Sequence, residues 1–257
     1  DDNDTALMVM SDHGFCEFTR ALNLNAWLKQ AGYLATDESR AAGDYFADVD
    51  WSRTQAYAFG LGGIYLNLSG RESKGIVTPG EQAKKLKAEI SARLGKLMDE
   101  SRQAIAIKSV YDNGQAYSGP YCENGPDLVI GYDRGYRVSW ESAVGRTDGP
   151  VFRDNTKYWS GDHCVDPELV PGVFFCNRRF TLSEDPAITD VAPTILKLFG
   201  VPVPPYMDGV AREFDVNQES RLPEPVVATV SVSGQAAVAF ADVEAVTDSQ
   251  ACTEVDR

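Results

Sequence analysis

The chain has 257 residues, of which 43% are hydrophobic, so it can form one large α/β domain or two smaller ones. Its formal net charge of −14 argues against general binding to nucleic-acid polymers, because an acidic surface repels phosphates. No apolar run approaches the roughly 20 residues that a membrane-spanning helix needs. A local cationic or metal-bearing site could still hold a phosphate.

The first predicted element is an apolar run over 6–10 that ends in Ser11, Asp12, His13 and Gly14. Its length and residue types predict a buried strand, and Gly14 allows a sharp turn after it. Asp12 and His13 would then lie at the carboxyl end of a strand, where open α/β sheets place ligands. A carboxylate beside an imidazole suits a divalent metal such as zinc. A polar turn is the alternative, because these residue types are common in turns.

The next segments alternate between helical and extended patterns. Mixed three- and four-residue spacing predicts a helix over 22–31 that ends at Gly32, followed by a polar loop over 36–49. Alternation predicts a strand over 64–68. The clearest helix begins at Pro79, and its apolar face consists of Ala83, Leu86, Ile90, Leu94, Leu97 and Met98.

The second half of the chain is predicted to be mainly extended. Strands are expected over 104–111, 127–132, 135–140 and 172–176, with a polar stretch over 142–160. A capped helix from 189 ends at Gly200. After Pro223 two β-compatible runs follow, over 226–234 and 238–246. We therefore expect one domain over 1–215, then a linker and the start of a β-rich module over 216–257, with a disordered tail as the alternative.

The sequence contains only two histidines, and each follows an aspartate. His13 follows Asp12, and His163 follows Asp162. This repeated context favours a shared site, in which Asp162 could orient the His163 imidazole; a structural role for each histidine is the alternative. The five cysteines lack the paired spacing of a zinc ribbon and are expected to be ordinary buried thiols.

Several motifs resemble one enzyme superfamily. The Ser-Asp-His-Gly stretch over 11–14 resembles the Asp-His-Gly motif of the alkaline phosphatase superfamily, in the branch of type I phosphodiesterases, nucleotide pyrophosphatases and cofactor-independent phosphoglycerate mutases. Further stretches are similar, in the same order, to a bacterial and archaeal group of predicted phosphohydrolases or phosphomutases in that superfamily: 49–57, 62–67, 70–72, 160–164, 190–196 and 207–209. The resemblance covers about residues 5–215.

The resemblance implies a fold and a metal centre. The fold is α/β, a three-layer α/β/α sandwich with a central, mostly parallel sheet, of which this chain would hold the C-terminal part, followed by a β-rich tail. The implied cofactors are two divalent metal ions, with zinc expected and manganese as the alternative. Asp12 and His13 would hold one ion and His163 the other. The remaining ligands and a Thr or Ser nucleophile would precede residue 1, so the catalytic nucleophile is unknown in this chain.

The implied activity is hydrolysis of phosphate esters, of the phosphodiester or nucleotide pyrophosphate type, with a small-molecule phosphate ester as partner. A phosphomutase, sulfatase or phosphotransferase on the same scaffold is one alternative, and a non-catalytic binding protein that retains the fold is another. The chain lacks an initial Met and reaches an apolar strand after a short polar stretch. We therefore expect it to be a fragment that is inactive alone, because half of each metal's ligand set would be missing.

Overall fold

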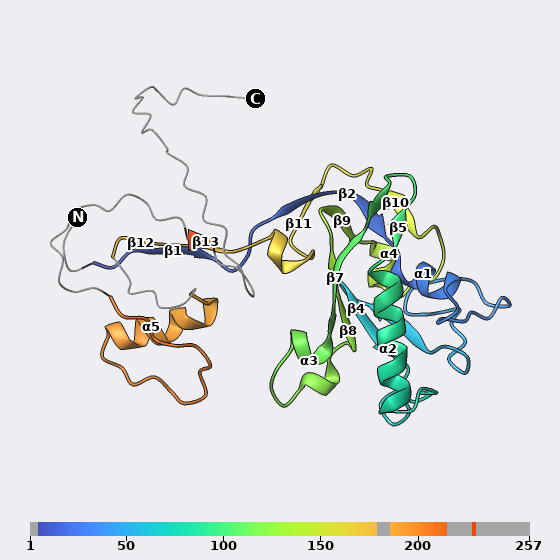
Figure 1. Ribbon diagram of the computed structural model, residues 1–257, viewed down its shortest axis with the longest axis horizontal. Coiled ribbons are helices and arrows are strands. Elements are labelled where there is room, and N and C mark those ends of the chain that lie inside the picture. The colour runs from blue at the N-terminus through green and yellow to red at the C-terminus, as the bar shows by residue number, and fades with distance from the viewer. Residues whose placement is uncertain (1–4, 179–185, 215–227, 230–257) are drawn as a thin grey trace, which may run out of the picture.

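The computed structural model describes residues 5–178, 186–214 and 228–229. They form a mixed α/β protein with several small sheets. Figure 1 shows two lobes: β1, β12 and α5 lie in one, and α2 with the sheet beside it lies in the other. Two chain segments connect the lobes, one after β1 and one after β11.

The smaller lobe is built on a three-stranded antiparallel sheet in the order β1-β12-β13. Its strands are β1 (Met8–Ser11), β12 (Val173–Cys176) and β13 (Ala228–Thr229). Helix α5 (Val191–Leu198) packs beside it (Figure 1). The predicted opening strand is confirmed as β1, but its expected burial is wrong, because Val9 is 53% exposed and Met10 is 41% exposed.

Strand β2 (Cys16–Leu22) carries the chain into the larger lobe. It pairs in parallel with β9 (Gly135–Val138) and antiparallel with β10 (Phe152–Asp154) and β11 (Gly161–Asp162). Phe18 of β2 pairs with Gly135 and also donates its backbone N–H to Ser160 O at 2.7 Å. Strand β2 therefore lies between β9 and β11.

A second, antiparallel sheet has the order β3-β4-β8-β7. Its strands are β3 (Ala56–Phe59), β4 (Gly63–Leu66), β7 (Ile107–Asp112) and β8 (Leu128–Tyr132). Gly60 and Gly62 adopt φ of +73° and +149° in the turn that joins β3 to β4, a backbone region that favours glycine. A connection this short can only place the two strands side by side in opposite directions.

Helix α2 (Glu81–Leu94) is the helix that the sequence predicts from Pro79, and its existence is confirmed. Its buried residues are Ala83, Leu86, Ile90 and Leu94, so four members of the predicted apolar face lie in the core. Leu97 and Met98 lie beyond the helix, and Met98 belongs to β5 (Met98–Asp99). The apolar spacing thus predicted the face correctly and overestimated the length.

The remaining elements are short. They are α1 (Leu24–Gln30), α3 (Asn113–Ala116), α4 (Trp140–Ala143), β6 (Ala104–Ile105) and the single 3-10 turns Cys122–Asn124, Pro167–Leu169 and Ile188–Asp190. Helix α1 confirms the helix expected before Gly32, and Asn23 caps its start by accepting the N–H of Ala26. Strand β9 ends before residue 140 because Ser139 caps α4.

The predicted mostly parallel sheet is not what the described residues form. Among the strands that the structure describes, β2 and β9 make the single parallel pair, and the other pairs are antiparallel. Short turns connect β3 to β4 and β5 to β6, and such connections produce hairpins. The α/β class is therefore confirmed at the level of a mixed α/β protein. Apart from β13, the β-rich module predicted over 216–257 lies outside the described residues.

None of the helices in the described part of the chain combines the length and the apolar composition that a membrane crossing requires.

Candidate metal centre

The predicted metal ligands lie on the two segments that connect the lobes. Asp12 and His13 lie between β1 and β2, and His163 follows β11 on the way to β12. The two segments are joined by backbone contacts, because Gly14 N donates to Val170 O at 3.0 Å. The fold therefore brings the two predicted halves of the site side by side.

The two imidazole rings are in direct contact. The ring centroids of His13 and His163 are 4.0 Å apart and the ring planes differ by 7°. Both side chains are partly exposed, at 31% for His13 and 45% for His163. The ring of Phe15 lies nearly perpendicular to both, at centroid distances of 5.4 Å and 5.6 Å. The site is thus an exposed pair of imidazoles beside one aromatic wall.

The hydrogen bonding of His13 leaves one ring nitrogen available as a ligand. Its Nδ1 lies 2.9 Å from the carbonyl oxygen of Gly14, which can only accept, so Nδ1 carries the proton. In the neutral ring Nε2 then has a free lone pair, the arrangement that metal-binding histidines commonly adopt. Asp12 Oδ1 lies 3.8 Å from that Nε2. This separation is smaller than the sum of two zinc–ligand bonds, about 4.1 Å, so both atoms can reach one ion.

Asp162 contacts the backbone of His163 and does not hydrogen bond to its ring. Its Oδ1 accepts the backbone N–H groups of His163 at 2.8 Å and Cys164 at 3.0 Å. The distance from the same Oδ1 to His163 Nδ1 is 3.9 Å, which is too long for a hydrogen bond. Its Oδ2 lies 2.7 Å from Nε of Arg137, in an ion pair whose two side chains are 3% and 4% exposed. This geometry gives Asp162 a role in shaping the turn that carries His163.

Cys164 lies close to the site. The possible ligand atoms of Asp162, His163 and Cys164 all fall within 4.8 Å of one another. Burial, together with the Asp162 carboxylate, raises the pKa of the Cys164 thiol to about 11, so the thiol is protonated near neutral pH. Metals bind the thiolate, so a metal at Cys164 would have to displace this proton, whereas a neutral imidazole already offers a lone pair. These surroundings favour His163 over Cys164 as the ligand from this segment.

Two residues beside the site were not found by sequence reasoning. Phe15 carries no chemical motif, although its position directly after the Asp-His-Gly stretch could have drawn attention to it. Arg137 lies in β9, far from both histidines in sequence, and is 3% exposed. Its link to Asp162 depends on the pairing of three strands, for which the sequence carries no local signal.

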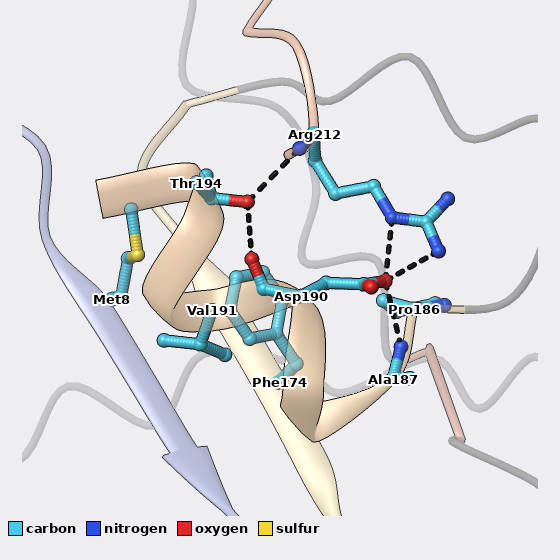
Figure 2. A pocket seen from close by; sticks show the side chains of 8 residues that line it. All are labelled: Met8, Phe174, Pro186, Ala187, Asp190, Val191, Thr194 and Arg212. Atoms are coloured by element: carbon cyan, nitrogen blue, oxygen red, sulfur yellow. Dashed lines mark hydrogen bonds and ion pairs between the residues drawn. The ribbon is translucent and has the colours of Figure 1, made fainter. Parts of the chain in front are cut away.

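The pocket under α5 is separate from the histidines. Figure 2 shows the Asp190 carboxylate directed toward Arg212 and the backbone of Ala187. It accepts the N–H of Ala187 at 3.1 Å, the N–H of Val210 at 2.8 Å and Nε–H of Arg212 at 2.7 Å. Burial acts to raise the pKa of Asp190, but these donors together hold it below its ordinary value. The arrangement ties residues 186–190 to 210–212 and is structural.

Comparison with known families gives one match. The family model described as type I phosphodiesterase / nucleotide pyrophosphatase matches residues 1–163. The matched span contains Asp12 and His13 and ends at His163. A comparison with curated proteins found no match.

Proposed function

Because the chain belongs to the type I phosphodiesterase / nucleotide pyrophosphatase family, we propose that it is part of a metal-dependent phosphohydrolase that acts on phosphodiesters or nucleotide-type pyrophosphates. In this proposal residues 1–215 are the C-terminal part of an alkaline-phosphatase-like catalytic domain, and residues 216–257 are a linker and the start of a β-rich module. The substrate is a small-molecule phosphate ester.

The observation that carries the proposal is the contact between His13 and His163. The sequence contains two histidines, and the fold stacks their rings at 4.0 Å although they follow different strands. A structural role would not require both rings to remain partly exposed. Exposed, adjacent imidazoles beside a carboxylate are instead suited to holding metal ions.

The proposed ligand roles follow the donor atoms. Asp12 Oδ1 and His13 Nε2 hold one ion, and the His163 imidazole holds a second. Zinc suits imidazole and carboxylate donors, and manganese is the alternative. When bound, two such ions supply the positive charge that a phosphoryl group needs in its transition state and that a protein of net charge −14 otherwise lacks.

The other residues of this chain position the ligands. The Gly14 carbonyl fixes the tautomer of His13, and the Asp162 carboxylate fixes the backbone of His163. Phe15 limits the space beside both rings. The nucleophile, a Thr or Ser, and the remaining ligands belong to a segment before residue 1, so the 257-residue chain alone is inactive.

The proposed complete domain is a three-layer α/β/α sandwich with a mostly parallel central sheet. The support in this chain is β1, which lies at the edge of its sheet in the described residues and carries exposed Val9 and Met10. An exposed apolar edge strand is a surface on which further strands can pair. In the proposed domain a strand from the segment before residue 1 would pair with this edge of β1.

A substrate comparison on the full-length, zinc-loaded protein tests the function. We expect hydrolysis of bis(4-nitrophenyl) phosphate to exceed that of 4-nitrophenyl phosphate and 4-nitrophenyl sulfate. EDTA should abolish it, and zinc or manganese should restore it. His13→Ala should reduce it about 100-fold or more, because loss of a hydrogen-bonded partner of a metal ligand already costs about 10- to 100-fold. Tyr158→Ala, which changes a fully exposed side chain, is the control.

Three results would each contradict the proposal: a full-length protein that binds neither metal, a preference for the sulfate ester, or a His13→Ala variant as active as wild type. Intramolecular phosphate transfer without net hydrolysis would replace it with a phosphomutase.

A further inference from the structure

The buried ion pair between Arg137 and Asp162 crosses strand β2 next to the proposed metal ligand His163. Arg137 pairs in register with Ala21 on the β9 side of β2, and Asp162 pairs with Cys16 on the β11 side. The Arg137 side chain reaches across β2, and its guanidinium carbon lies 5.0 Å from the centroid of the Phe18 ring. Its Nε then lies 2.7 Å from Asp162 Oδ2, an ion pair of two buried groups without the alignment of a hydrogen bond. One side chain therefore links the strands on both edges of β2.

Aromatic rings hold the guanidinium in place. Its central carbon lies 4.6 Å from the centroid of Trp140 and 4.6 Å from that of Trp159. Arginine stacks on aromatic faces through its planar, delocalised charge, and lysine cannot reproduce this contact. Arg137 is thus fixed by three rings and one carboxylate. The enclosed cation can in turn attract the Asp162 carboxylate and orient it.

The ion pair continues directly into the metal centre. The second oxygen of Asp162 accepts the backbone N–H groups of His163 and Cys164. These two bonds set the turn from which the His163 ring projects against His13. A buried ion pair is weak evidence for stability alone, because desolvation offsets its attraction. Its value here is the geometry that it imposes on His163.

We propose that Arg137 is a positioning residue for the metal centre. It holds the Asp162 carboxylate in the orientation that fixes the backbone of His163 and so keeps the His163 imidazole stacked on His13. The part of this inference that concerns metal affinity rests on the proposed function. The part that concerns the stacking of the two imidazole rings does not depend on the proposed function.

The test compares two arginines of the 257-residue chain, Arg137, which is buried, and Arg20, whose side chain is 12% exposed. Arg137→Gln removes the ion pair to Asp162. Arg20→Gln is the control. Arg20 lies on β2, pairs with Asp99 at 2.6 Å and with Asp154 at 2.8 Å, and has its guanidinium carbon 5.6 Å from the Phe152 ring centroid. None of these partners is adjacent in sequence to His13 or His163. Thermal unfolding of both variants measures the general loss of stability.

Ring resonances and zinc affinity measure the positioning. The sequence has two histidines, so a long-range 1H–15N spectrum shows two imidazoles. In Arg137→Gln we expect the resonances of both rings to move as their stacking is lost. In the full-length protein we expect the same substitution to lower the zinc affinity, measured against a chromophoric chelator, roughly 10- to 100-fold. Arg20→Gln should lower thermal stability by a similar amount to Arg137→Gln and leave the ring resonances and the zinc affinity unchanged.

The outcomes separate the inference from the proposed function. Wild-type ring resonances in a folded Arg137→Gln variant would overturn the inference. If Arg137→Gln fails to fold, Arg137→Met decides, because it keeps an apolar stem against the rings and cannot pair with Asp162. Shifted rings support the positioning role, and wild-type rings overturn it. If the wild-type chain and the full-length protein bind no zinc while the rings shift in Arg137→Gln alone, the positioning role stands and the proposed function falls.

Discussion

The imidazole rings of His13 and His163 lie parallel, 4.0 Å apart between centroids, at the crossing between the two lobes. The contact follows from strand pairing on both sides of it. β1 pairs antiparallel with β12 in one lobe, and β2 pairs antiparallel with β11 in the other. The connections between these pairs must therefore run side by side. Each histidine lies in one of them.

Gly172 is predicted to control how closely these two connections approach. A Cβ atom at Gly172 would lie 2.4 Å from Ser11 O and 2.9 Å from Asp12 O, and neither backbone oxygen can move without separating β1 from β12. We expect Gly172→Ala to lower the free energy of unfolding by about 1–3 kcal/mol, as overpacking does, and to weaken zinc binding. Urea unfolding and a zinc titration measure the two effects. Gly114→Ala is the control, because its Cβ would meet no atom within 4 Å; equal behaviour of the two variants would refute the prediction.

Cys164 is predicted to be dispensable for metal binding. Its thiol has a pKa raised to about 11 by burial and by Asp162, and its Asp162 neighbour is occupied by Arg137 and two backbone N–H groups. Cys164→Ala should therefore keep the zinc affinity of wild type within about twofold, whereas loss of a direct ligand costs far more. Competition with a chromophoric chelator provides the measurement. A tenfold loss of zinc affinity in Cys164→Ala would show that the thiol is a ligand and would contradict the prediction.

The region around α5 is predicted to lose stability in acid. Although burial alone would raise the pKa of Asp190, the N–H groups of Val210 and Ala187 and the Arg212 guanidinium hold it below its ordinary value of 3.8. A carboxylate with a lowered folded-state pKa stabilises the fold above its unfolded pKa, and this contribution is lost as the pH falls through the folded value. Asp190→Asn should therefore show a smaller loss of unfolding free energy between pH 7 and pH 3 than wild type does.

Urea titrations at the two pH values measure this difference. Glu213→Gln is the control, since the Glu213 side chain is 75% exposed and its pairing with Lys197 is screened by solvent. An Asp190→Asn variant with the full acid sensitivity of wild type would exclude Asp190 as its source.

The sequence predicts those parts of the molecule whose signals are local. The period of apolar residues identified α2 and its buried face, and the apolar run before Asp12 identified β1. The shared Asp-His context of His13 and His163 led to the expectation of a shared site. The structure brings the two rings together, and their metal-binding role stays a prediction.

The remaining features depend on contacts between distant segments. Strand β2 contains Glu17 and Arg20, and these charged residues hide a strand that is recognisable only from its partners on both edges. The burial of Arg137 requires Trp140, Trp159 and Asp162 to meet around it, which no local pattern encodes. The expected parallel sheet came from the family resemblance, and the described part of the chain has mostly antiparallel pairs.

The position of bound zinc tests the central claim most directly. Crystals of the full-length protein grown with zinc should show two peaks of anomalous scattering at the zinc edge, about 4 Å apart. One peak should lie at Asp12 and His13, and the other at His163. Zinc bound away from both histidines, or no zinc in a correctly folded protein, would contradict the account.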